Sequence, residues 1–86
     1  MNEDHVLTVF LVEDSPMIRD NLIATLEELA PVRVLDCEAD EPGAVRWLAE
    51  DGHRPDLVIV DLFLRSGSGL GVLRSMREQG HGAEPV

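Results

Sequence analysis

Apolar residues occur in blocks along this chain, and the lengths of the blocks predict three strands. Residues 6–12 (VLTVFLV) form a nearly unbroken apolar run rich in β-branched side chains, which is typical of a strand covered on both faces. Residues 56–61 (DLVIVD) show the same pattern and end on a carboxylate. Residues 32–37 (VRVLDC) are shorter and partly alternating, which favours an edge strand with one wetter face.

The segment after the first predicted strand has the signals of a helix. Asp14 or Ser15 can cap it, Pro16 suits its first turn, and Pro31 stops it. Four apolar residues recur at helical spacing and predict one stripe that packs on the sheet: Ile18, Leu22, Leu26 and Leu29.

Two more helices follow the second and third strands. A cap, an acid and a proline at residues 40–42 start a short helix that we expect to reach Gly52, and Leu70, Leu73 and Met76 mark a third helix that ends at Gly80. The last residues (HGAEPV) look like the approach to a further strand, which we expect to begin only at Val86.

Strands that alternate with helices predict an α/β fold with parallel pairing. Right-handed crossovers place the first strand in the middle, so the order is 2-1-3 and the architecture is βαβαβα in a doubly wound sheet. At 86 residues the chain is at most one domain. The carboxyl ends of the first and third strands are therefore expected to be neighbours.

Composition narrows the possible functions. The net charge of −10, with seven Lys and Arg against seventeen Asp and Glu, argues against direct nucleic-acid binding, because phosphate contacts need clustered cations. No apolar run is long enough to cross a bilayer. The lone Cys37 cannot form an internal disulfide, and the first residues lack the features of a signal peptide, so we expect a cytoplasmic protein.

Three acids follow the two strands predicted to be adjacent: Glu13, Asp14 and Asp61. Open parallel sheets bind ligands outside the carboxyl ends of their strands. Crowded carboxylates repel one another unless a cation neutralises them, and Mg²⁺ takes oxygen ligands and phosphate oxygens. Asp61 would then be free to act as a nucleophile towards a phosphoryl group. The ordinary alternative is that these acids only end a strand and cap a helix.

The segments VFLVEDSPMIRDNL and PDLVIVDLFLRSGSGLGVL and the final AEPV resemble the receiver domains of bacterial two-component response regulators. The resemblance covers essentially the whole chain and includes Gly69, eight positions beyond Asp61. It implies a flavodoxin-like fold, with residues 1–86 as a partial receiver domain. It also implies that Asp61 is phosphorylated, that Asp14 binds the metal directly and Glu13 through water, and that Phe63 offers its backbone carbonyl.

The function implied is that of a phosphoacceptor rather than an enzyme, with a histidine kinase, a phosphotransfer protein or a small acyl phosphate as donor. The sequence departs from the family pattern at two points: the first concerns the mobility of one loop, and only the second concerns switching. Arg65 stands where a proline is common. The family's Ser or Thr after strand four and its Lys after strand five are not found, since the sequence has no Lys and stops at Val86. We therefore expect the chain to bind metal better than it switches on phosphorylation.

Stopping before strand four leaves one edge of the sheet open, and open edges are templates for pairing. We therefore expect self-association, or a separate C-terminal fragment that supplies the missing strands. The cognate kinase, the downstream target and the continuation beyond Val86 cannot be predicted from the sequence.

Three other classes of function compete with the receiver. Residues 67–71 (GSGLG) could form a phosphate-cradling turn of a dinucleotide fold, but Val72 stands where the next glycine is needed. A haloacid-dehalogenase-type phosphatase would need an Asp where Phe63 stands. An interaction module with vestigial acids remains open, and metal-dependent binding of a phosphoryl analogue would distinguish it.

The remaining notable side chains have structural interpretations. The histidines His5, His53 and His81 are too scattered for a metal site and are expected to be solvated. Trp47 is expected to be a partly buried packing residue, and Cys37 a core residue.

Overall fold

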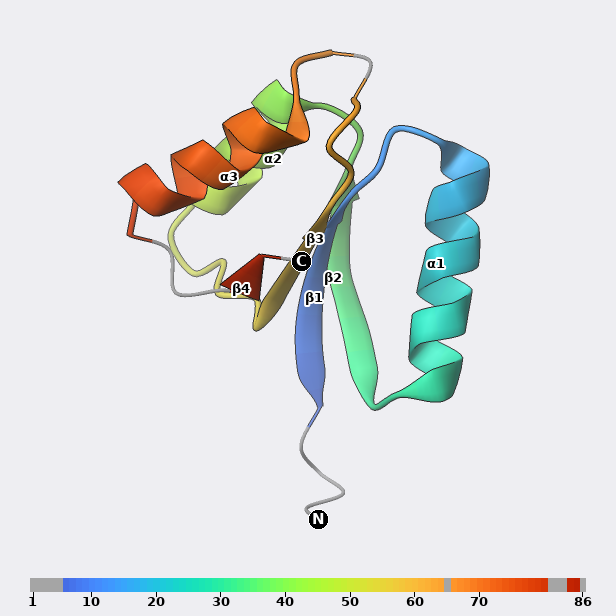
Figure 1. The fold of residues 1–86 in the computed structure, drawn as a ribbon. Helices are drawn as coiled ribbons and strands as arrows, with labels where there is room; N and C mark the ends of the chain where they lie inside the picture. The colour runs from blue at the N-terminus through green and yellow to red at the C-terminus, as the bar shows by residue number, and fades with distance from the viewer. Residues whose placement is uncertain (1–5, 65, 81–83, 86) are drawn as a thin grey trace.

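The computed structural model describes residues 6–64, 66–80 and 84–85, and for the last two only the backbone. A parallel sheet forms the middle layer, with α1 on one face and α2 and α3 on the other (Figure 1). The strands are β1 (Leu7–Val12), β2 (Val32–Glu38), β3 (Leu57–Val60) and β4 (Glu84–Pro85), in the order β2-β1-β3-β4. The predicted α/β class, parallel pairing and 2-1-3 order are confirmed.

The fourth strand corrects the prediction in one respect. Glu84 and Pro85 pair in parallel with Leu57 and Val58, so β4 begins two residues before Val86 and extends the predicted βαβαβα by one short strand. The apolar pattern could not show this, because a strand's first residues need only backbone groups in register.

The three helices begin as their capping residues predict. Ser15 accepts a hydrogen bond from Ile18 N and caps α1 (Pro16–Leu29), and Asp40 caps α2 (Glu41–Ala49) in the same way through Gly43 N. Ser68 caps α3 (Gly69–Glu78). The second helix ends at Ala49, three residues before the predicted Gly52, because the chain turns there and Gly52 adopts a left-handed φ of 92°.

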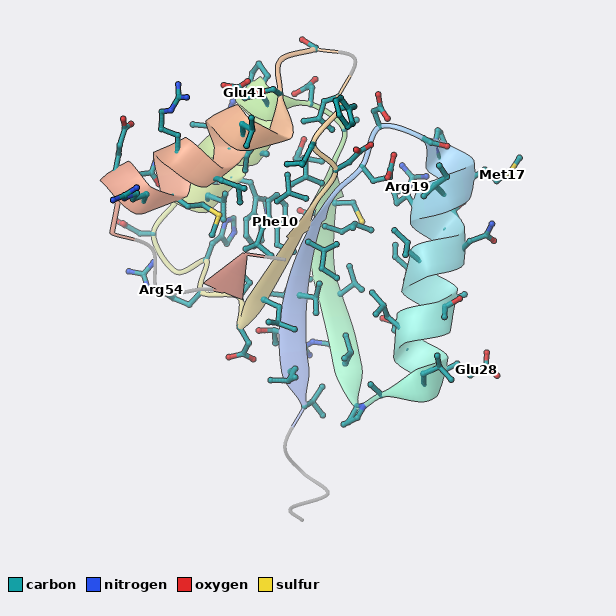
Figure 2. All side chains as sticks on the ribbon, in the orientation of Figure 1. Phe10, Met17, Arg19, Glu28, Glu41 and Arg54 are labelled. Atoms are coloured by element: carbon teal, nitrogen blue, oxygen red, sulfur yellow. The ribbon has the colours of Figure 1, made fainter. Side chains whose placement is uncertain are left out.

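The core lies between the sheet and the pair α2 and α3. Side chains of the central strands β1 and β3 meet those of the two helices in one buried cluster, formed by Phe10, Val12, Ala44, Trp47, Leu48, Val58, Val72 and Met76. Phe10, labelled in Figure 2, lies on the α2 and α3 side of the sheet. It stacks on Trp47 with ring centroids 4.0 Å apart, and such a pair contributes about 0.5–1.5 kcal/mol beyond its buried area. Trp47 is thus a packing residue, as predicted.

A bulge in β2 sets which side chains face this core. Val9 pairs with Val34, but Phe10 pairs with Asp36, so Leu35 is the extra residue. The shift places Asp36 on the same side as Phe10, where its carboxylate accepts a hydrogen bond from Trp47 Nε1 at 3.0 Å. Cys37 falls on the other side and is half-buried rather than a core residue, and this burial raises the pKa of its thiol.

Helix α1 packs differently from the prediction. No residue of α1 is fully buried, and Ile18 and Leu29 are 50% and 78% exposed. The half-buried face carries Leu22, Ile23 and Leu26. The two ends of the predicted stripe, Ile18 and Leu29, therefore lie outside the face that packs on the sheet. The apolar face of α1 is wider than the strip of sheet that it covers. None of the helices in the described part of the chain is long and apolar enough to span a membrane.

His53 corrects another prediction. It is half-buried, with its ring stacked on Trp47 at a centroid distance of 3.9 Å and its Nδ1 2.6 Å from the Trp47 carbonyl oxygen. The turn after α2 folds it back onto the helix, which sequence spacing cannot show. His5 and His81 lie outside the described residues.

Candidate functional site

The pairing of β1 with β2 extends one residue beyond β1 and fixes the first acid. Glu13 N donates to the carbonyl oxygen of Glu38 at 3.0 Å, and the Glu13 side chain is buried, with 7% of the residue exposed. Its Oε2 accepts a hydrogen bond from Ser15 N at 3.1 Å, which turns the chain towards α1. Asp14 lies within that turn and is half-buried.

Asp61 reaches the same edge from β3. Its backbone N–H donates to the carbonyl oxygen of Val12 at 2.9 Å, which continues the β1 and β3 pairing past the end of β3. Its carboxylate Oδ1 accepts a hydrogen bond from Phe63 N at 3.0 Å. The side chain of Asp61 is therefore oriented by the start of its own loop.

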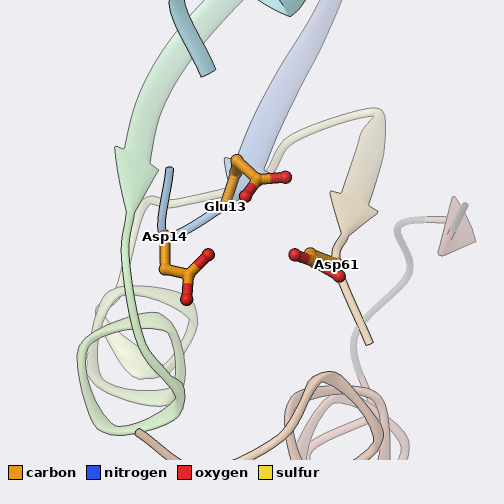
Figure 3. A group of neighbouring side chains, drawn as sticks. All are labelled: Glu13, Asp14 and Asp61. Carbon is orange, nitrogen blue, oxygen red and sulfur yellow. The ribbon is translucent and has the colours of Figure 1, made fainter. Parts of the chain in front are cut away.

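The three acids converge as the strand order predicts. Glu13, Asp14 and Asp61 each offer one carboxylate oxygen, and these oxygens all lie within 4.8 Å of one another. In Figure 3 the three side chains point into a common space between the ends of β1 and β3. Three negative charges this close repel, and a hard divalent cation with oxygen ligands offsets the repulsion. The donor set therefore suits a metal of that type.

Phe63 approaches the acids with its backbone. Its side chain is 87% exposed and turns away from the core, whereas its N–H contacts the Asp61 carboxylate. This hydrogen bond keeps the main chain of residue 63 beside the acids. A role for the Phe63 carbonyl oxygen as a metal ligand stays a prediction.

Gly69 lets α3 start directly against the Asp61 backbone. Its N–H donates to the carbonyl oxygen of Leu62 at 3.2 Å, and a Cβ at this position would overlap the carbonyl oxygen of Asp61 and lie 2.7 Å from Leu62 Cα. The contact atoms are backbone and cannot move aside. The glycine that follows Asp61 by eight residues is thus explained by close approach.

Sequence reasoning missed two acids near this edge. Glu38 ends β2, and partial burial, with Asp36 and Asp40 adding repulsion, raises the pKa of its carboxyl group. Glu41 begins α2, and its Oε1 accepts a hydrogen bond from Ser68 N at 2.7 Å. The only available signal for Glu41 was a helix-start acid, which is common. Its carboxylate already takes the N–H of Ser68, a backbone donor of the turn at residues 67–71, and a negative charge there would repel a phosphate, which disfavours the dinucleotide alternative.

The comparisons with known proteins agree with the geometry. The family model of the response regulator receiver domain matches residues 9–86. The chain is 32% identical over 79 residues to an uncharacterized response regulatory protein of Vibrio cholerae serotype O1, covering 92% of this chain and 29% of that protein. It is 28% identical over 79 residues to a probable C4-dicarboxylate response regulator of Priestia megaterium, covering 92% of this chain and 34% of the relative.

A solved response regulator has the same fold. A LuxR-family two-component response regulator from Aurantimonas sp. SI85-9A1 superposes with a TM-score of 0.82 at 27% identity, covering 94% of this chain and 56% of the other.

The parallel sheet in this strand order, flanked by helices on both faces, has the flavodoxin-like architecture of receiver domains, and it superposes on a solved response regulator. The chain belongs to the family of response regulator receiver domains of two-component systems, as the resemblance in the sequence implied. It spans about a third of the length of the curated relatives named above.

The close approach at Gly69 generates the first prediction. Gly69→Ala should lower the free energy of unfolding by about 3 kcal/mol, because the new methyl group meets backbone that cannot yield. Urea unfolding followed by circular dichroism measures the loss. Gly80→Ala is the control: its Cβ meets nothing within 4 Å, and its left-handed φ of 67° should cost only about 1 kcal/mol. Equal losses for the two variants would refute the steric explanation.

Proposed function

We propose that this chain is a phosphoryl-accepting receiver, in which Asp61 is phosphorylated with the help of Mg²⁺. The observation that carries the proposal is the convergence of Glu13, Asp14 and Asp61 within 4.8 Å at the ends of β1 and β3. The donor would be the phosphohistidine of a partner histidine kinase or phosphotransfer protein, or a small acyl phosphate. The proposal treats residues 1–86 as part of one receiver domain and places the protein in the cytoplasm.

The chemistry requires little from the protein besides position and charge. An oxygen of the Asp61 carboxylate attacks the phosphorus, and the bond from phosphorus to the donor nitrogen or acyl oxygen breaks. The donor leaves as a histidine imidazole, which takes up a proton, or as a carboxylate. The Phe63 N–H holds Oδ1 of Asp61, which leaves the other oxygen, Oδ2, as the natural nucleophile.

The metal site is proposed on the chemistry of its ligands. Asp14 and Asp61 would bind Mg²⁺ directly, Glu13 would act through water, and the Phe63 carbonyl would supply a neutral oxygen. Bound Mg²⁺ would neutralise the carboxylates and the incoming phosphoryl oxygens. The burial of Glu13 and its bond to Ser15 N suit an indirect role, because this carboxylate is already engaged.

A dedicated hydrolase is a weaker alternative. Such an enzyme would place a general acid two residues after the nucleophile, and the exposed apolar side chain of Phe63 cannot transfer a proton. We therefore propose a signalling domain and regard any self-dephosphorylation as incidental.

The first prediction from this proposal concerns the metal. Mg²⁺ should bind weakly, and Asp14→Ala should reduce the affinity by about tenfold or more, because a direct ligand is lost. A titration that follows the amide NMR shifts of residues 13, 14 and 61–63 measures it. Asp51→Ala removes an exposed acid in the turn after α2 and should leave the affinity unchanged. An undiminished response in Asp14→Ala would contradict the assignment.

The second prediction concerns the phosphoacceptor. With Mg²⁺ and acetyl phosphate, intact-mass spectrometry should show one added phosphoryl group, and Asp61→Asn should abolish it, since an amide is a poor nucleophile. Beryllofluoride should bind at the same residue and only with metal. The control is Asp51→Asn, which should be modified normally. Modification that persists in Asp61→Asn, or that ignores removal of Mg²⁺, would leave the interaction module as the better explanation.

The third prediction concerns partners. Among the described residues β4 pairs with only Leu57 and Val58 of β3. We propose that a second copy of this polypeptide pairs along the outer edge of β4, the outermost strand of the described sheet, because an exposed strand edge is a template for pairing. Sedimentation at micromolar concentration should show a dimer. A compact monomer that unfolds cooperatively would exclude this.

A further inference from the structure

The start of α2 is tied directly to the loop that follows the phosphoacceptor. Glu41, the first residue of α2, donates its backbone N–H to the carbonyl oxygen of Ser66 at 3.0 Å. Its side-chain Oε1 accepts a hydrogen bond from Ser68 N at 2.7 Å. One residue thus holds two positions of the loop that lie 25 and 27 positions further along the chain, and Figure 2 shows it where α2 meets the beginning of α3.

Two glycines make room for this side chain. A Cβ at Gly67 would overlap Glu41 Cβ, and a Cβ at Gly71 would overlap the Glu41 carboxylate. Gly67 also has a φ of 86°, which favours glycine on its own. The carboxylate therefore lies closely against the first turn of α3, where the helix dipole favours a negative charge.

The bond from Ser68 N to Glu41 is not needed to cap α3. Ser68 performs that role with its own hydroxyl, which accepts a hydrogen bond from Gly71 N at 3.1 Å. The N–H of Ser68 belongs to the incoming loop and not to the intrahelical ladder. Glu41 therefore restrains the loop itself.

The loop between β3 and α3 is consequently held at both ends. At its beginning, Phe63 N binds the Asp61 carboxylate and Gly69 N binds the Leu62 carbonyl oxygen. At its far end, Glu41 binds residues 66 and 68. These contacts restrict the backbone of residues 62–63 and 66–69, so the main chain of residue 63 stays beside the acids.

We propose that Glu41 is a positioning residue for the acidic site: it touches neither metal nor phosphoryl group, and it fixes the loop that presents the backbone of Phe63 to the carboxylates. This inference rests on the proposed function for its effect on Mg²⁺, but the restraint of the loop is independent of it. Glu41 thus couples α2 to the phosphoacceptor loop.

Two variants of Glu41 test the proposal. Glu41→Ala removes the acceptor oxygen and should weaken Mg²⁺ binding roughly three- to tenfold, the range expected for one net hydrogen bond. Glu41→Gln keeps an amide oxygen for Ser68 N and should restore the affinity to within about twofold of the parent. Glu78→Ala, an exposed acid at the end of α3, is the matched control and should change nothing. The readouts are Mg²⁺ titration by NMR and urea unfolding.

Hydrogen exchange of the amides of Phe63 and Ser68 in metal-free protein separates this inference from the proposed function. Faster exchange in Glu41→Ala, but not in Glu41→Gln, supports the restraint even if the parent protein fails to bind Mg²⁺. Unchanged exchange overturns it. Equal weakening of Mg²⁺ binding in both variants, in proportion to lost global stability, would also overturn it, because a merely structural residue predicts that result.

Discussion

The burial of β1 on both faces is the constraint on which the rest of the structure depends. Val9, Phe10, Leu11 and Val12 are each at most 1% exposed, which is possible only for a strand with neighbours on both edges and helices on both faces. β2 and β3 therefore lie on either side of it. This places the residues that follow β1 beside the residue that follows β3, and the acidic site is a direct consequence of where the apolar surface is hidden.

The acids themselves oppose folding, because like charges are brought together at one edge. The backbone holds them there: Glu13 and Asp61 extend the ladders of β1 by one hydrogen bond each, to Glu38 O and Val12 O. Their positions are thus maintained by sheet pairing rather than by mutual attraction. Electrostatic repulsion of this kind is common at sites that bind cations, where stability is exchanged for affinity.

Sequence patterns predicted the features that follow from local chemistry or from general rules of chain connection. The caps at Ser15 and Asp40 predicted the helix starts. The alternation of strands and helices, with right-handed crossovers, predicted the strand order and hence the meeting of Glu13, Asp14 and Asp61. The features that failed depend on distant contacts. The exposed ends of the α1 stripe follow from how much of the sheet one helix covers, and the stacking of His53 on Trp47 follows from a turn. Neither the exposure of the ends of α1 nor the stacking of His53 can be predicted from the spacing of residues along the sequence.

Glu41 shows the same limit from the functional side. It could be recognised only as a helix-start acid, because its two partners, Ser66 and Ser68, lie in another loop. That loop contains no proline, and it has Arg65 at the position where the resemblance in the sequence leads us to expect one. A proline would restrict the backbone of the unfolded and folded chain alike. Without one, a restraint on residues 66–68 must come from tertiary contacts, and the hydrogen bonds to Glu41 are contacts of this kind. Gly67 and Gly71 leave the space that the Glu41 side chain occupies. A carboxylate from α2 can therefore restrain this loop by tertiary contact, where a proline would restrain it covalently.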